Sequence, residues 1–346
     1  MVIFTGRIFL TQNQARKEEL MIETEHLPIR QAKEAYVFDY PEPAAYANTQ
    51  MSVYWTPDEI NVEKDVQDLR VNMTPSEKHG VITVLKLFTL YELLVGGEYW
   101  NGRYKEAFPR PEFELLGATL GFVELGIHAQ FYNKLNEAMM LNTEEFYTAY
   151  EHDPILKSRI DFVNASAEDE DLLYSLAVFT LLEGAVLYSS FAFLKSFQSQ
   201  GKNLLNNVCR GINFSVRDEN LHSEAGAWTF KKVLNEAIYT DQQYKDLLQR
   251  IDKAADHIFD HEVRIIDMIF EEGDIPGLDK DSMQEFVKSR INLCLSNLGL
   301  EDKYVVDENP IEEWFYAGIN STQFGDFFNG IQSEYNRNWD EGAFDF

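Results

Sequence analysis

The chain has 346 residues, 45% of them hydrophobic, which is enough to bury the core of one large domain or of two ordinary ones. Its formal net charge of −28 disfavours nucleic acid and anionic membranes as partners, because both carry negative charge. The two cysteines, Cys209 and Cys294, are too few for a disulfide framework and fit a reducing cytoplasm. The N-terminus lacks the pattern of a signal peptide, and we find no apolar run of the roughly 18–20 residues that a membrane span needs.

The first strong helix is expected to begin at Thr74. This residue is a suitable N-cap, and Glu77 completes a capping box with it. An apolar stripe at helical spacing follows, and Glu92 lies on that stripe. The two glycines at positions 96 and 97 are expected to weaken or end this helix.

A second helix is predicted after the Pro-Arg-Pro sequence at residues 109–111, and Glu124 and His128 interrupt its apolar face. A third helix is predicted over residues 168–198. It is apolar on nearly all sides, which indicates that it is buried. Glu183 lies at its centre, and because a buried carboxylate without a partner is costly, this residue requires one.

A fourth helix is predicted to begin near residue 202, and it carries Glu219 and His222. Residues three apart lie on one helix face, so these two side chains can point at one object. A second pair, His257 and His261, has no such context. The acidic residues beside it suggest a solvated helix face rather than a metal site.

Two further helices are predicted over residues 241–271 and 280–298. The periodic pattern ends near residue 321. We therefore expect one helical domain over residues 1–320 and a flexible tail over residues 321–346.

Four predicted helices thus place potential metal ligands in the middle of apolar faces. Taken singly, Glu92 could be a helix-end carboxylate, Glu183 the partner of an arginine, and His128 a hydrogen-bonded core histidine. Taken together, four carboxylates and two histidines are the ligand set of a di-metal site in a four-helix bundle. Four carboxylates neutralise two divalent ions, and each histidine adds a nitrogen ligand. The six residues are Glu92, Glu124, His128, Glu183, Glu219 and His222.

With these residues in place, the chain resembles the small, radical-generating subunit of class I ribonucleotide reductase. The sequence Arg-Asp-Glu-Asn-Leu-His at residues 217–222 matches the family pattern Arg-Asp-Glu-x-x-His. His128, followed four residues later by Tyr132, matches the family's ligand histidine and radical tyrosine. Trp55, before a Thr-Pro-Asp-Glu sequence, resembles its radical-transfer tryptophan. The resemblance extends from about Trp55 to the last residue.

The resemblance implies an all-α fold: a ferritin-like helical bundle with a di-metal carboxylate site, extra helices and a flexible C-terminal tail. It implies that the six residues above bind a dinuclear metal centre, with Fe/Fe, Mn/Fe or Mn/Mn as the alternatives. Oxygen would activate this centre to give a one-electron oxidant. A separate large subunit would use that oxidant to reduce ribonucleotides to deoxyribonucleotides, in a reaction dependent on thioredoxin or glutaredoxin.

The resemblance also implies residue roles and partners. Tyr132 would carry a radical, or would donate a hydrogen bond beside a metal-based oxidant. Trp55, Asp218 and Tyr335 would transfer the radical, and Asp218 would hydrogen-bond a ligand histidine, here His128. The acidic-aromatic tail would dock on the large subunit. A homodimer is expected from the family, and the need for an activating flavoprotein stays open.

Two departures from the family pattern affect the predicted centre. Glu124 precedes His128 by four residues, where the family usually has three. A one-residue π-bulge would absorb the difference. Leu125 has the usual spacing from His128 but cannot ligate a metal, so Glu124 remains the predicted ligand. Glu92 replaces the aspartate that is commonest at its position, which resembles subclasses that use manganese. Tyr132 favours a tyrosyl radical instead.

Two other functions are compatible with the same bundle. One is a di-metal ligand-binding oxidase or hydroxylase, and the other is a ferritin-like metal-storage protein. Neither has much need of Trp55, Asp218 and an acidic-aromatic tail together, and storage chains are usually shorter.

Overall fold

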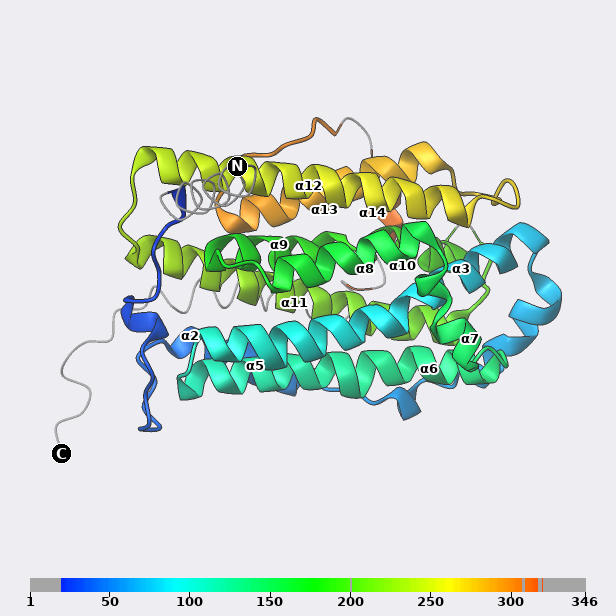
Figure 1. Cartoon of the computed structure of the whole chain (residues 1–346). Coiled ribbons are helices and arrows are strands. Elements are labelled where there is room, and N and C mark those ends of the chain that lie inside the picture. Colours follow the sequence, from blue (N-terminus) through cyan, green and yellow to red (C-terminus); the bar gives the residue numbers. More distant parts are fainter. Residues whose placement is uncertain (1–19, 200, 307–308, 317–318, 320–346) are drawn as a thin grey trace, which may run out of the picture.

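The computed structural model describes residues 20–199, 201–306, 309–316 and 319 (Figure 1). In these residues the β structure is one isolated bridge between Ile275 and Leu278, so the predicted all-α class is confirmed. The longer helices are α2 (Pro41–Ser52), α3 (Pro75–Leu93), α5 (Pro111–Val123), α6 (Ala129–Ala138), α8 (Pro154–Ala167), α9 (Leu172–Ala185), α10 (Tyr188–Lys195), α11 (Asn206–Glu236), α12 (Asp241–Ile269) and α13 (Lys280–Leu298). The shorter ones are α4 (Lys105–Ala107), α7 (Glu144–Tyr147) and α14 (Pro310–Phe315). The 3-10 turns are η1 (Pro28–Arg30), η2 (Pro57–Glu59), η3 (Val62–Asp65), η7 (Ala149–Glu151) and η8 (Ser196–Gln198), and the π-helical segments are η4 (Asp68–Asn72), η5 (Leu94–Tyr104) and η6 (Glu124–His128).

Helix α9 is the central element of the bundle. It packs against α11, α12 and α13, and all of its residues except Tyr174 are buried. Figure 1 shows α12 and α13 along one side of the molecule, α5 and α6 along the opposite side, and α9 and α11 between them. A helix that is apolar all round must be enclosed in this way to remove its surface from water.

Helix starts follow the predicted capping chemistry. Thr74 accepts a hydrogen bond from the backbone N–H of Glu77, and the Glu77 carboxylate accepts one from the backbone N–H of Thr74 at 2.9 Å. Helix α13 has the predicted bounds. Asp279 caps its start and Gly299, at φ 80°, ends it in the left-handed conformation that glycine favours.

The structure departs from the predicted helix continuity at two places. The helix that carries Glu92 does not end at residues 96–97, but its α-helical geometry changes to the π-helical geometry of η5 from Leu94 onward. Gly96 serves close packing instead, since a Cβ there would lie 2.6 Å from the Cβ of Glu124. The third helix is interrupted after Ala185, where Leu187 adopts a left-handed φ of 70°.

Among the described residues, two helical stretches have the length and composition of a membrane span, contrary to expectation: Pro75–Ala107 and Leu172–Gln198. Within the protein, 65% and 100% of their apolar windows are buried. Packing inside the bundle therefore accounts for their composition.

Candidate metal centre

The structure brings all six predicted ligand side chains together in the middle of the bundle. Their donor atoms form two groups, and within each group the atoms lie within 4.8 Å of one another. The first group is Glu92, Glu124, His128 and Glu219, and the second is Glu124, Glu183, Glu219 and His222. Every one of these side chains is buried. Two of the carboxylates, Glu124 and Glu219, belong to both groups.

Both imidazoles present Nδ1 to the shared carboxylates. His128 Nδ1 lies 3.0 Å from Glu124 Oε2 and 3.1 Å from Glu219 Oε1. His222 Nδ1 lies 2.5 Å from Glu124 Oε1 and 3.5 Å from Glu219 Oε2. The two outer carboxylates are farther away: Glu92 Oε2 is 4.0 Å from His128 Nδ1, and Glu183 Oε1 is 3.9 Å from His222 Nδ1.

The four-residue spacing of Glu124 and His128 is accommodated by η6. This segment is π-helical, and the N–H of Ala129 bonds to the carbonyl of Glu124, five residues earlier. The wider turn holds one additional residue, and both Glu124 and His128 point into the site. The predicted π-bulge is therefore present.

Burial and mutual charge shift the pKa values in opposite directions. Burial and the neighbouring Glu124 raise the pKa of Glu92 well above its usual range, and burial and Glu219 do the same for Glu183. At Glu124, the two imidazoles outweigh burial and hold the pKa well below its usual range. Despite burial, Glu124 raises the pKa of His222 to about 9 and contributes most to raising that of His128. Protons thus balance part of the negative charge of the site.

The donor atoms fit a pair of divalent cations. Within the described residues, Glu92 Oε1, Glu124 Oε1 and both oxygens of Glu219 are buried and lack a hydrogen bond of normal geometry. Buried polar atoms are normally satisfied, so several unsatisfied oxygens at one point mark a place for a positively charged ligand. Carboxylate oxygens with two imidazole nitrogens are a ligand set suited to iron and manganese.

Asp218 connects the centre to Trp55. Its Oδ2 atom accepts a 2.7 Å hydrogen bond from Trp55 Nε1–H and lies 3.2 Å from His128 Nε2. Arg217 donates from Nε to the other oxygen at 3.1 Å. Although burial raises the pKa of Asp218, the hydrogen bond from His128 and the charge of Arg217 hold it below the usual value. The predicted contact between Asp218 and His128 is present.

Tyr132 lies inside the core beside the first group. Its ring centroid is 4.4 Å from that of Phe88, and its side chain has no solvent exposure. Burial raises the pKa of its hydroxyl well above the usual value, and the charge of Glu92 adds to the effect. The phenol is therefore protonated at neutral pH. Tyr335 lies outside the described residues.

The sequence reasoning missed one side chain at the centre. Trp100, in η5, donates from Nε1 to Glu183 Oε1 at 2.5 Å and packs 6.2 Å from the ring of His222. It follows Glu92 by eight residues, so helical periodicity could have found it. The expectation that the helix weakens or ends at residues 96–97 concealed that signal.

The interpretation of residues 257–262 as a solvated face was wrong. His261 and Glu262 are buried. Glu262 forms an ion pair with the buried Arg159 of α8, and Ser158 lies 3.2 Å from His261 Nε2. A buried charge on an otherwise amphipathic helix requires such a partner, and this one is 103 residues away in sequence.

The model of the family "Ribonucleotide reductase, small chain" matches residues 32–310. The chain belongs to this family. The matched range contains the positions of all six predicted ligands. This small chain is 27% identical over 307 residues to the ribonucleoside-diphosphate reductase subunit beta of Halalkalibacterium halodurans, covering 84% of this chain and 85% of that protein. It is 26% identical over 283 residues to the corresponding subunit of Treponema pallidum, covering 77% and 76%.

Solved structures agree on the fold of the small chain. The dimanganese(II)-NrdF of Streptococcus sanguinis superposes with a TM-score of 0.72 at 20% identity, over 84% of this chain and 99% of that chain. The expected ferritin-like bundle is thus confirmed. The protein is the small subunit of a ribonucleoside-diphosphate reductase, an oxidoreductase, with a buried carboxylate and histidine cluster that fits a di-metal centre.

Proposed function

We propose that Glu92, Glu124, His128, Glu183, Glu219 and His222 bind two divalent ions drawn from iron and manganese. The observation that carries this proposal is the pair of ligand groups that share Glu124 and Glu219, since shared carboxylates can hold two ions side by side. When bound, the metal pair supplies the one-electron oxidising equivalent on which ribonucleotide reduction depends. The dimanganese form of a protein with the same fold supports manganese as one candidate.

The residues around the site would hold and move protons and electrons. With Nε2–H of His128 donated to Asp218, Nδ1 is left free as a metal ligand, and the ring orientation is fixed. The same aspartate oxygen accepts from Trp55, so one atom joins the ligand histidine to the buried indole. We assign radical transfer to Trp55 and Asp218. Tyr132, protonated and shielded from water, would store the oxidising equivalent by losing its electron and proton together.

The partner in this reaction is the large catalytic subunit. We propose that residues 321–346 form a separate tail that docks on it, with Tyr335 as the relay between subunits. The acidic and aromatic composition of the tail supports this assignment. From the family we also expect a second copy of the chain, and the two cysteines fit a cytoplasmic location. The need for an activating flavoprotein is a question that the loading experiment below answers.

Anaerobic metal loading tests the proposal. The protein is titrated with Mn²⁺, Fe²⁺ or both, then exposed to oxygen with and without a reduced flavoprotein, and assayed with its large subunit. We expect two ions per chain and activity only after loading. Electron paramagnetic resonance of the Tyr132→Phe variant then separates a tyrosyl radical, whose signal disappears, from a metal-based oxidant, whose multi-line signal persists.

The matched variants are Glu219→Gln and Glu112→Gln. Glu219 belongs to both ligand groups, so its replacement should lower the metal stoichiometry. Glu112 is an equally buried carboxylate paired with Arg110 outside the site, and its replacement should leave two ions bound. Full stoichiometry in Glu219→Gln would contradict the ligand assignment. Uptake of many iron ions per chain, without activity, would instead indicate metal storage.

A further inference from the structure

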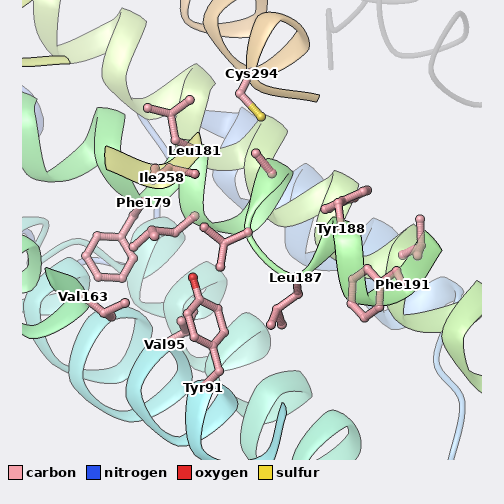
Figure 2. Close-up of a cluster of buried hydrophobic side chains, with 14 of the residues drawn as sticks. Tyr91, Val95, Val163, Phe179, Leu181, Leu187, Tyr188, Phe191, Ile258 and Cys294 are labelled. Atoms are coloured by element: carbon pink, nitrogen blue, oxygen red, sulfur yellow. The ribbon is translucent and has the colours of Figure 1, made fainter. Parts of the chain in front are cut away.

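The helix that carries Glu183 is interrupted two residues after it. Helix α9 ends at Ala185 and α10 begins at Tyr188. Leu187 between them is buried, with a left-handed φ of 70° that is unfavourable for any residue with a Cβ. Figure 2 shows Leu187 and Tyr188 among the buried hydrophobic side chains. Such a conformation persists only where the surrounding structure holds it.

Arg290 of α13 holds the first side of this interruption. Its Nε donates to the carbonyl of Gly184 at 2.9 Å and its Nη2 to Asn220 Oδ1 at 2.7 Å. Its Nη1 donates to the hydroxyl of Tyr316 at 2.7 Å. The guanidinium carbon lies 3.9 Å from the ring centroid of Tyr188. The side chain is 2% exposed, and in the part of the chain that the structure describes no acidic side chain forms an ion pair with it.

A buried anion holds the second side. Glu262 Oε2 accepts hydrogen bonds from the backbone N–H of Ser189 at 3.3 Å and from its hydroxyl at 2.5 Å. A cation thus lies at the C-terminal end of α9 and an anion at the N-terminal end of α10. Both charges match the partial charges of the helix ends. Arg159 pairs with Glu262, whereas the bonds of Arg290 go to neutral groups.

Two of the bonds of Arg290 end next to proposed metal ligands. Gly184 follows Glu183 directly, and Asn220 follows Glu219. Gly184 leaves no room for adjustment, since a Cβ there would lie 2.3 Å from Cys294 Sγ. The third bond goes to Tyr316, the first residue after α14.

We propose that Arg290 is a positioning residue for Glu183 and Glu219, and that it connects these two ligands to the C-terminal segment at Tyr316. This inference rests on the proposed ligand set. Arg290 touches neither carboxylate, so it acts through the backbone of α9 and the side chain of Asn220. Its removal should therefore weaken the second ligand group, which contains Glu183 and His222, more than the first.

The test is anaerobic binding of Mn²⁺ to the full chain, measured by calorimetry and by electron paramagnetic resonance. In the Arg290→Met variant we expect one of the two ions to bind about 10- to 100-fold more weakly, the usual effect of losing a residue that orients a ligand. The resonance signal should change from that of a coupled manganese pair to that of an isolated ion. Arg290→Lys, which keeps the charge but lacks the planar fork, should rescue the second ion only in part.

The control is Arg110→Met. Arg110 is a buried arginine with several backbone bonds, but it lies outside the metal centre, so its loss should lower stability without changing either affinity. If Arg290→Met does not fold, Tyr316→Phe tests the proposal in its place. This substitution removes a single hydrogen bond of Arg290 and should weaken binding of the same ion to a smaller extent. Unchanged affinities in the variants of Arg290 and Tyr316 would overturn the inference. If the wild type failed to bind two ions, or Glu183→Gln bound them normally, the proposed ligand set itself would be wrong.

Discussion

A single oxygen atom of Asp218 accepts hydrogen bonds from two side chains, Trp55 and His128. The other oxygen of the carboxylate accepts one from Arg217. All three partners are donors, so only a group that accepts on both sides fits between them. The family's Arg-Asp-Glu-x-x-His pattern thus has a physical explanation at its first two residues.

We predict that Asp218→Asn keeps two metal ions but lowers activity with the large subunit by at least about 10-fold. Asparagine has one acceptor oxygen, and its NH₂ group would face a donor on the other side. Reductase assays on metal-loaded protein, with metal content measured in parallel, check this outcome.

Two comparison variants sharpen that test. Trp55→Phe removes the indole N–H together with the five-membered ring, and it should reduce activity while leaving metal affinity unchanged, because His128 keeps its bond to Asp218. Asp65→Asn alters a buried carboxylate that accepts from the backbone N–H of Val208 away from the centre, and should leave activity unchanged. Normal activity in Trp55→Phe would exclude the indole from radical transfer.

At the scale of one element, the packing of η5 against Glu124 depends on one of its two adjacent glycines, Gly96, because Gly97 faces open space. A Cβ on Gly96 would lie 2.6 Å from the Cβ of Glu124, whereas a Cβ on Gly97 would meet nothing within 4 Å. We predict that Gly96→Ala destabilises the protein by about 1–3 kcal/mol and weakens metal binding, because the backbone must move away from Glu124. Denaturant unfolding and Mn²⁺ titration measure the two effects.

Gly97→Ala is the matched variant. Alanine has the better helix propensity and space is available, so the free energy of unfolding should rise by up to about 1 kcal/mol. Equal effects of the two substitutions would mean that helix propensity, and not contact with Glu124, determines the role of these glycines.

How far the sequence predicts each element depends on whether its signals are local. The bounds of α13 follow from Asp279 and Gly299, which act within one turn of the helix. The interruption at Leu187 has no local signal, since Val and Leu are ordinary in a buried helix. It is held by Arg290 and Glu262, from elements that lie far along the chain.

The predicted site shows the same division. The six proposed ligands on four apolar faces could be found because a charged or imidazole side chain on such a face is conspicuous in the sequence. The Trp100–Glu183 bond depends on the path of η5 past the two glycines, which propensity alone predicts wrongly. Likewise, the buried Arg159–Glu262 pair joins α8 to α12, and neither residue alone indicates the other.

At the scale of the whole molecule, acid stability should depend on His261. Burial, followed by the neighbouring His257 and Arg159, lowers the pKa of His261 from 6.5 to about 3. The unfolded chain therefore binds a proton below pH 6.5 that the folded protein does not, and stability falls as the pH drops from 6.5 towards 3. We predict that His261→Gln, which does not titrate, loses less stability than the wild type over this interval.

Denaturant unfolding of the metal-free proteins between about pH 7 and pH 4 measures this difference. The exposed His26 provides the control: His26→Gln should follow the wild-type curve. Parallel curves for His261→Gln and the wild type would mean that His261 is protonated in the folded protein as readily as in the unfolded chain.

Assembly with the large subunit should depend on the C-terminal residues. All six proposed ligands, together with Trp55, Asp218 and Tyr132, lie in the part of the chain that the structure describes, so deletion of residues 335–346 should leave metal stoichiometry and unfolding unchanged. The deleted residues contain Tyr335 and the acidic-aromatic sequence that ends at Phe346. We expect loss of binding to the large subunit, measured by calorimetry, and loss of activity with it.

A chain that carries the same residues in scrambled order separates the effect of composition from that of sequence, because a purely charge-driven contact would survive scrambling and weaken with salt. Unchanged binding after the deletion would place the docking surface on the helical bundle instead.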